Sequence, residues 1–159
     1  MPTVLITGMS GTGKSSALTE LARRGHVVVD TDDVGWIVEL DTPSGPEPVW
    51  DEDRMTALLD EHVDGVLFVA GCVANQARFY SRFDAVVLLS APLEVVLARV
   101  ATRTDNAFGS TAAQREKIAR DLREFEPLLR ARADIEIAST VPLDTVATEL
   151  ERVAGTSSG

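Results

Sequence analysis

The sequence predicts an α/β domain in which a five-stranded parallel sheet is covered by helices on both faces. Short, continuously apolar runs alternate with amphipathic stretches, and strands buried on both faces have this pattern. The five runs are residues 3–7, 26–30, 66–70, 85–89 and 134–138. The chain has 159 residues, of which 45% are hydrophobic, so it can bury a sizeable core. We expect one domain over residues 1–155 and a flexible tail at 156–159.

Helices are expected between these strands, beginning at residue 14, at Pro92, near Thr111 and before Val146. Pro127 should kink or end the third helix, because proline has no N–H to donate. Two stretches interrupt the alternation. Residues 41–50 are rich in proline and predict a loop, and residues 104–110 predict a polar loop between two helices.

The composition excludes several classes of protein. With 15 Lys and Arg against 25 Asp and Glu, the formal net charge is −10, which argues against a general nucleic-acid or anionic-membrane binder. The longest apolar runs are only strand-sized, and we see no secretory signal. The single Cys72 excludes an internal disulfide framework and predicts a small buried thiol. We expect a cytoplasmic protein, monomeric or homodimeric, without nucleic-acid or membrane partners.

The negative charge is concentrated in one part of the chain. Residues 30–64 hold twelve acidic residues and one basic residue, Arg54, for a net charge of −11. The other residues therefore sum to +1, and eight of the fifteen basic residues lie between Arg99 and Arg132. This asymmetry favours a neutral or cationic ligand on the acidic side.

The most specific motif is the run Gly8-Met9-Ser10-Gly11-Thr12-Gly13-Lys14-Ser15, which fits the phosphate-loop pattern G-x-x-x-x-G-K-[ST] at every fixed position. Its glycines let backbone N–H groups point at phosphate oxygens, and the next helix presents its positive end to the anion. Lys14 can reach the β- and γ-phosphates, and the Ser15 hydroxyl can ligate Mg²⁺. We expect ATP or GTP to bind here with Mg²⁺, on Gly8, Ser10, Gly11, Thr12, Gly13, Lys14, Ser15 and Ser16.

Acidic residues follow the second predicted strand as Asp30-Thr31-Asp32-Asp33. Ligands of open parallel sheets bind beyond the carboxyl ends of the strands, so these carboxylates should lie near the phosphates. They can hold Mg²⁺ or its waters, and they can orient a hydroxyl for attack on the γ-phosphate. A helix N-cap with solvated acids is the alternative interpretation.

Two branches of phosphate-loop proteins are not supported by the sequence. A GTPase needs a guanine-reading Asn-Lys-x-Asp, which the chain lacks. A motor or AAA-type ATPase needs an apolar strand that ends in adjacent acids. Neither residues 66–70 nor residues 85–89 are followed by such a pair.

The phosphate loop and the acids after the second strand resemble the small phosphate-loop kinases, which include shikimate kinase, gluconate kinase and the nucleoside monophosphate kinases. The resemblance implies a three-layer P-loop NTPase fold with strand order 2-3-1-4-5 and a short mobile lid. In shikimate kinase-like proteins the first acid of an Asp-x-Asp faces the hydrated metal and the second faces the acceptor hydroxyl. The resemblance therefore implies Asp30 as a metal residue and Asp32 as a catalytic residue.

The resemblance extends to basic residues further along the chain. Monophosphate kinases carry two arginines four residues apart at the start of the lid, one on the adenine and one on phosphates. Arg99 and Arg103 match this spacing, which implies that both bind the nucleotide and that Arg103 is catalytic. Residues 104–117 would form the lid, and Pro142 would lie in the loop beside the adenine.

The acceptor region that the resemblance implies lies between the second and third strands, over residues 33–64. Side chains in this region, with the acid before it and the segment after the third strand, are candidate acceptor-binding residues: Asp32, Asp33, Trp36, Arg54, Gly71, Asn75, Gln76 and Arg78. Gly71 would let a ligand approach the backbone, but the consecutive glycines of shikimate kinase are absent. A capped helix with an ordinary polar face is the alternative for residues 71–80.

These residues predict an MgATP-dependent phosphotransferase that acts on a hydroxyl group of a small-molecule metabolite. Lys14 and Arg103 would stabilise the transferring phosphoryl group, and Asp32 would orient or deprotonate the hydroxyl. A nucleotide-binding regulatory ATPase without a small acceptor is one alternative. The other is a nucleoside monophosphate kinase, which requires a basic pocket formed by Arg54, Arg78 and Arg82.

Overall fold

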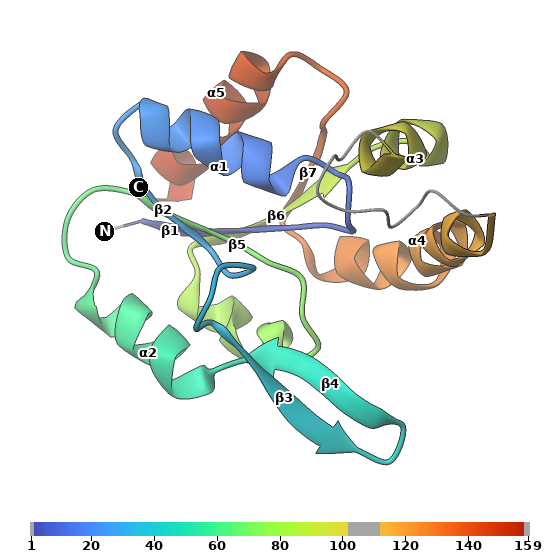
Figure 1. The fold of residues 1–159 in the computed structure, drawn as a ribbon. Coiled ribbons are helices and arrows are strands. Elements are labelled where there is room, and N and C mark those ends of the chain that lie inside the picture. The colour runs from blue at the N-terminus through green and yellow to red at the C-terminus, as the bar shows by residue number, and fades with distance from the viewer. Residues whose placement is uncertain (1, 102–111, 158–159) are drawn as a thin grey trace.

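A five-stranded parallel sheet forms the centre of the computed structural model, which describes residues 2–101 and 112–157 (Figure 1). Its strands are β1 (Thr3–Thr7), β2 (Val27–Asp30), β5 (Leu67–Ala70), β6 (Ala85–Ser90) and β7 (Ile135–Ala138). They lie in the order β2-β5-β1-β6-β7, and every neighbouring pair is parallel. When only the strands of this sheet are counted along the chain, this is the predicted order 2-3-1-4-5.

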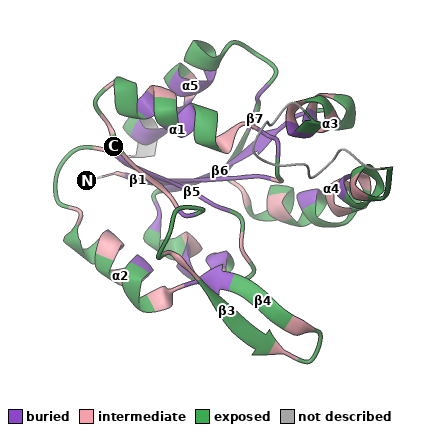
Figure 2. Ribbon diagram, viewed as in Figure 1, coloured by how far each residue is buried: buried purple, intermediate pink, exposed green. Residues whose placement is uncertain are grey.

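Helices cover both faces of the sheet. α1 (Lys14–Arg23) and α5 (Leu143–Ser157) pack on one face, and α2 (Glu52–Glu61) and the 3₁₀ helix η1 (Gln76–Arg82) pack on the other. α3 (Leu93–Ala101) and α4 (Ala112–Arg132) pack on each other. Figure 2 shows the buried strands between helices whose outer faces are exposed. In the ranges that the structure describes, no helix is long and apolar enough to cross a membrane.

Alternate residues of the central strands fill the two halves of the core. Val4 and Ile6 of β1 pack beneath α1 and α5, whereas Leu5 packs toward α2. All three side chains are fully buried. Because both faces of the strand are covered, its sequence is a continuous apolar run rather than an alternating one.

The Pro-rich stretch at residues 41–50 belongs to a β-hairpin, so the predicted loop is wrong. β3 (Ile37–Thr42) and β4 (Gly45–Trp50) form a separate antiparallel sheet of two strands. Pro46 and Pro48 lie two positions apart, so their missing N–H groups fall on the same side of β4. The outer side of a two-stranded sheet needs no donor, and proline excludes a central strand but not an edge strand.

Two helix ends also differ from the prediction. α4 continues through Pro127 to Arg132. The proline removes the bond to the carbonyl of the exposed residue Arg123, where water can replace it. α5 runs to Ser157 and includes two residues of the predicted tail, because Val153 and Ala154 anchor its last turns in the core.

Candidate active site

Close packing determines the shape of the glycine-rich loop between β1 and α1. Gly11 and Gly13 have φ angles of +84° and +95°, a region that other residues rarely adopt. A Cβ atom on Gly8 would lie 2.5 Å from the carbonyl oxygen of Leu89, so the loop passes directly beside the end of β6. Steric constraints therefore favour glycine at these positions of the motif.

The loop and the end of β2 enclose a small cavity of about 120 Å³. Three predicted catalytic or metal-binding positions meet there, because Lys14, Ser15 and Asp32 all line it. The predicted nucleotide-binding residues Ser10 and Ser16 line it as well. The structure thus brings the core of the predicted phosphate site together.

The two predicted metal-binding side chains are in contact. Ser15 Oγ donates to Asp30 Oδ2 at 2.8 Å, and Asp30 Oδ1 accepts from the backbone N–H of Asp32 at 3.0 Å. A hydroxyl beside a carboxylate suits Mg²⁺, which takes one or two protein ligands and completes its shell with phosphate oxygens and waters. No group of three or more Asp, Glu, His or Cys that could hold a metal exists among the described residues. The donor set therefore fits Mg²⁺ that is bound together with phosphates.

Two side chains of the motif bond to the loop itself. The Lys14 ammonium donates to the carbonyl oxygens of Gly8 at 2.6 Å and Met9 at 3.1 Å, which holds it across the loop. Thr12 is fully buried, and its Oγ1 donates to the carbonyl oxygen of Met9 at 2.7 Å. The Thr12 side chain supports the loop, and its predicted nucleotide contact stays a prediction that the backbone N–H of Thr12 could fulfil.

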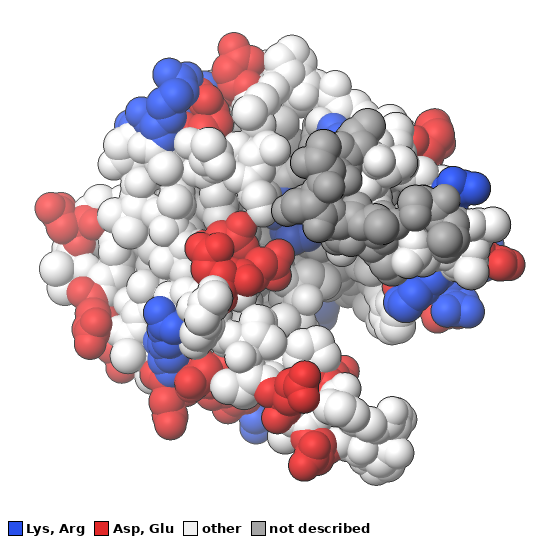
Figure 3. Space-filling view, viewed as in Figure 1, with Lys and Arg blue, Asp and Glu red and all other residues white. Residues whose placement is uncertain are grey.

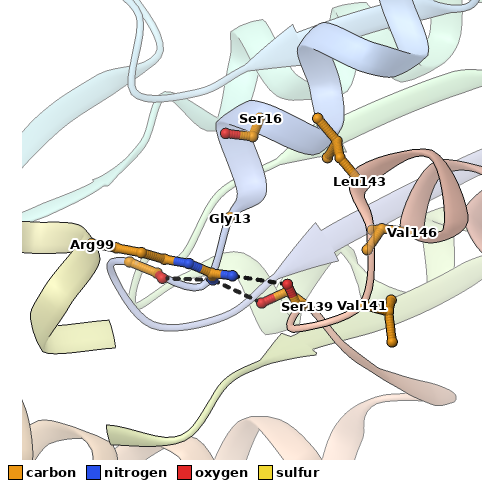
Figure 4. A pocket seen from close by; sticks show the side chains of 8 residues that line it. Gly13, Ser16, Arg99, Ser139, Val141, Leu143 and Val146 are labelled. Atoms are coloured by element: carbon orange, nitrogen blue, oxygen red, sulfur yellow. Dashed lines mark hydrogen bonds between the residues drawn. The ribbon is translucent and has the colours of Figure 1, made fainter. Parts of the chain in front are cut away.

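A second cavity, of about 440 Å³, lies beside the loop between α3 and the segment before α5 (Figure 4). Arg99 of α3 extends into it. Its Nη1 donates to the Gly11 carbonyl oxygen at 3.1 Å and to Ser139 Oγ at 2.9 Å, and its Nη2 donates to the Ser139 carbonyl oxygen at 2.8 Å. Val141 and Leu143 add apolar surface to the wall. A planar cation and apolar side chains beside a phosphate loop suit a nucleotide base.

Ser139 lines this cavity and is the first residue of the loop, residues 139–142, that the resemblance places beside the adenine. The predicted Pro142 is exposed at the rim, where its carbonyl oxygen accepts from backbone N–H groups of α5. Arg103 and residues 104–111 of the predicted lid lie outside the described residues, and residues 112–117 belong to α4.

Three predicted acceptor-binding residues lie together between α1 and the edge strand β2. Asp33 and Trp36 line a cavity of about 500 Å³, which adjoins the phosphate site at Ser15. The Arg54 guanidinium lies 4.0 Å from the centroid of the Trp36 ring, a cation–π contact. This contact holds the segment before the hairpin on α2.

The predicted acceptor-binding residues after β5 bind to the protein itself. Asn75 accepts from the Trp50 N–H at 2.9 Å and donates to the Trp50 carbonyl oxygen at 3.1 Å, and Arg78 donates to Glu52 at 2.9 Å. The Asn75 amide and then the Arg78 guanidinium hold the pKa of Glu52 below its ordinary value. In the structure the two side chains attach η1 to the hairpin and to α2, and their predicted role in acceptor binding stays a prediction.

Gly71 and Gln76 are closely packed against neighbouring side chains, and Gln76 also lines the largest cavity, described below. A Cβ atom on Gly71 would lie 2.2 Å from Thr31 Oγ1, so this glycine makes room for a neighbouring side chain. Gln76 is buried and donates to Thr7 Oγ1 and to the Tyr80 hydroxyl, both at 2.9 Å. Its carbonyl oxygen accepts from the Val73 N–H at 3.0 Å, so every polar atom of the side-chain amide has a protein partner.

The largest of these cavities, of about 850 Å³, opens between the hairpin and α4; we call it the α4 cleft. It adjoins the phosphate loop at Met9 and Ser10, and the segment from Cys72 to Tyr80 supplies part of its wall. Cys72 is exposed there, which corrects the predicted buried thiol. The side chains of α4 that line this cleft were not among the predicted acceptor-binding residues.

The surface charges follow the asymmetry of the sequence. In Figure 3 acidic side chains gather over the end of β2, the hairpin and α2, whereas basic side chains gather on α4. The three arginines that a monophosphate pocket requires do not meet. Arg54, Arg78 and Arg82 bind three different partners, which are Trp36, Glu52 and Asp60.

The loop, its lysine and the serine bonded to an acid at the carboxyl edge of a parallel sheet define a phosphate-loop nucleotide-binding protein. A family model described as an AAA domain matches residues 4–125, more than half of the chain, so the chain belongs to this family. The match corrects the exclusion of AAA-type proteins. That exclusion rested on acids after the third and fourth strands of the sheet. β5 and β6 indeed end at Ala70 and Ser90 without such acids, so membership does not depend on them.

Solved structures show the same fold. A shikimate kinase from Acinetobacter baumannii in complex with shikimate has a TM-score of 0.69 at 21% identity, covering 98% of this chain and 94% of that one. A shikimate kinase from Bacteroides thetaiotaomicron has a TM-score of 0.65 at 15% identity, with 96% and 97% covered. A gluconokinase from Sinorhizobium meliloti 1021 has a TM-score of 0.56 at 20% identity, with 98% and 94% covered. No curated protein matches the sequence. The chain thus has the fold of the small phosphate-loop kinases.

Proposed function

We propose that the protein is an ATP-dependent kinase that transfers the γ-phosphoryl group to a hydroxyl group of a small molecule, with Mg²⁺ bound beside the phosphates. The observation that carries this proposal is the convergence of Lys14, Ser15 and Asp32 on one cavity, with Ser15 bonded to Asp30. The adjoining α4 cleft supports a second substrate, because a nucleotide-binding regulator needs no such space beside its phosphates.

Each residue has a distinct role in this proposal. Ser15 and Asp30 would hold Mg²⁺ directly or through water, and the ion would supply positive charge to the phosphate oxygens. Lys14 would stabilise the negative charge that develops on the transferring group. Arg99 would bind the base side of the nucleotide from α3, next to the loop that it already contacts through the Gly11 carbonyl oxygen.

The transfer is a substitution at the γ-phosphorus. The acceptor hydroxyl oxygen forms a bond to this phosphorus while the bond to the β–γ bridging oxygen breaks. The electron pair of the broken bond stays on ADP. The hydroxyl proton passes to the Asp32 carboxylate and from there to water, so that the acid returns to its starting state.

The comparisons support a small-molecule acceptor. The proteins of similar fold include a kinase that is named for shikimate and was solved with shikimate, and a gluconokinase. A nucleoside monophosphate is not supported, because the arginines that it requires bind elsewhere. The cytoplasmic location, the monomeric or homodimeric state and the lack of nucleic-acid and membrane partners stay predictions.

Replacement of Asp32 by Asn tests the proposal. We expect at least one small hydroxyl compound to stimulate ADP release from MgATP. We also expect Asp32→Asn to lower that rate by about 10²–10⁴-fold, because the group that accepts the proton is lost. The affinity for ATP, measured by titration calorimetry, should stay within about twofold, since Lys14 and the loop are unchanged.

Asp64→Asn is the matched control. It removes the same charge from an exposed carboxylate. Asp64 precedes β5 and so lies at the amino ends of the strands, away from the loop. Its replacement should change neither the rate of ADP release nor the affinity for ATP. Full transfer activity in Asp32→Asn would refute the role of Asp32. ADP release that no acceptor stimulates would favour the regulatory ATPase.

A further inference from the structure

The α4 cleft is the place where an acceptor can reach the phosphate site. Ser10 lines both the cleft and the phosphate cavity, so the two spaces are continuous at the loop. Figure 3 shows the surface hollowed between the hairpin and α4. A molecule seated on α4 can therefore present a group toward Asp32, which lines the phosphate cavity.

The α4 wall of this cleft is apolar. Phe125 and Leu128 are 47% and 63% exposed, and Leu129 lines the cleft with them. Tyr80 and Val73 line it from the segment after β5. Large apolar side chains that are exposed together in a concave surface gain free energy when a ligand covers them.

The charged side chains of the cleft balance one another. Lys117 Nζ donates to Asp121 Oδ2 at 2.6 Å, and the Arg132 guanidinium lies 5.3 Å from the centroid of the Tyr80 ring. Glu47 of β4 adds a second carboxylate. Within the described lining, two acidic residues thus accompany two basic residues, and an anionic acceptor meets no net positive charge.

We propose that the acceptor is an alcohol without a carboxylate or phosphate group, whose apolar ring or branched chain lies against Phe125 and Leu128. This inference rests on the proposed function and names its substrate class. Phe125 and Leu128 determine specificity. Burial of an apolar group against them is favourable, whereas neither side chain can donate a hydrogen bond to a carboxylate. The hydroxyl oxygen of this alcohol is the nucleophile that receives the phosphoryl group in the substitution described above, and its proton passes to Asp32.

Alcohols that differ by one carboxylate test this class. The probes are 2-phenylethanol with its carboxylated counterpart 3-phenyllactate, and cyclohexylmethanol with 4-(hydroxymethyl)cyclohexanecarboxylate; D-gluconate serves as a polar hydroxy acid. Binding is measured by titration calorimetry, and kcat/KM is measured from ADP release with MgATP. We expect each uncharged alcohol to exceed its carboxylated counterpart by about tenfold or more in both measurements, since an unpaired carboxylate is costly to desolvate.

Substitutions of Phe125 and Leu128 test whether the preference for uncharged alcohols arises from the α4 cleft. Phe125→Ser and Leu128→Ser should each raise the KM for cyclohexylmethanol by about tenfold, because loss of apolar contact in a pocket has effects of this size. The ATP affinity and the unfolding temperature should not change, since both side chains are exposed. Val63→Ser is the control, because Val63 is exposed before β5, at the amino ends of the strands and away from the α4 cleft.

The outcomes separate this inference from the proposed function. Higher kcat/KM with 3-phenyllactate or D-gluconate overturns the inference and leaves the kinase function intact. Binding of the alcohols in the expected order without stimulated ADP release supports the preference of the cleft and refutes the kinase function. Failure of both alcohols to bind overturns the inference, as does an unchanged KM in both serine variants.

Discussion

The phosphate cavity and the α4 cleft adjoin at Ser10, but they are built in opposite ways. The phosphate cavity depends on backbone conformation, since Gly11 and Gly13 adopt positive φ angles within one short loop. The α4 cleft is lined by segments far apart in the sequence. Side-chain contacts such as the pair of hydrogen bonds between Asn75 and Trp50 hold two of these segments together.

This difference determines what each region can change. Phosphate recognition uses backbone N–H groups and one lysine, so it tolerates substitutions elsewhere as long as the loop keeps its shape. The chemistry of the α4 cleft depends on exposed side chains such as Phe125 and Leu128. If the α4 cleft binds the acceptor as proposed, the acceptor class can change while the nucleotide site stays the same. The following predictions test this separation.

Of these substitutions, Arg99→Ala should have the largest effect, and this effect should be limited to nucleotide binding. The substitution removes the hydrogen bonds from Arg99 to Gly11 and Ser139 that join α3, the phosphate loop and the end of β7. We expect ATP affinity, measured by calorimetry, to fall by about 10–100-fold, because bonds to a charged group contribute this much. Arg23→Ala, at the far end of α1, is the control. The affinity of the α4 cleft for alcohols should not change. An equal loss of alcohol affinity would contradict the independence of the nucleotide site and the α4 cleft.

Gly71→Ala should disturb the packing between the end of β5 and the hairpin. The new methyl group would meet Thr31 Oγ1 and the Trp50 ring, so we expect a loss of about 1–3 kcal/mol in the free energy of unfolding. Urea denaturation measures the effect. Gly155→Ala is the matched control. Its Cβ atom meets nothing within 4 Å on helix α5, and alanine there should stabilise by up to about 1 kcal/mol. Equal stability of the two variants would refute the packing role of Gly71.

Glu136→Gln should have the smallest effect, because Glu136 lines neither the phosphate cavity nor the α4 cleft. The Arg130 guanidinium and then the Ser90 hydroxyl hold the pKa of Glu136 below its ordinary value of 4.5. A lowered pKa stabilises the fold above about pH 4.5, and the contribution is lost as the pH falls through the folded-state pKa. Glu136→Gln should therefore cost about 0.5 kcal/mol at neutral pH, as solvent-exposed pairs do.

Urea denaturation at neutral pH and at about pH 3.5 measures this effect. The difference in stability between Glu136→Gln and the parent should shrink at the lower pH, because that pH lies below the ordinary pKa of 4.5, where unfolding of the parent is coupled to proton uptake by this carboxylate. A difference that is equal at both pH values would contradict the assignment.

The sequence predicted those parts of the structure that depend on neighbouring residues. The apolar run at β1 and the glycines after it specify a buried strand and a curled loop without reference to the rest of the chain. The protein contacts of Asn75 and Arg78 could not be predicted, because their partners Trp50 and Glu52 lie more than twenty residues away. A polar side chain after a strand has the same appearance in a sequence whether it binds a ligand or another element.

The helix α4 shows a second limit of sequence patterns. Ile118 and Phe125 lie two helical turns apart on one face of α4, yet Ile118 is buried and Phe125 is exposed in the α4 cleft. Glu126, the next residue, is buried and pairs with Arg130 at 2.9 Å. A hydrophobic period predicts which side chains share a face of a helix, but it does not distinguish a core from a binding site.

The position of β1 between β5 and β6 has a consequence for folding. Leu5 lies opposite Val69 on one side and Val86 on the other, so the first strand of the chain pairs only with strands made much later. During synthesis β1 has no strand to pair with until β5 has emerged, and its second partner, β6, is made later still; such long-range pairing slows folding. The glycine loop therefore reaches its final packing only after β6 has been made, because Gly8 lies directly against Leu89 of that strand.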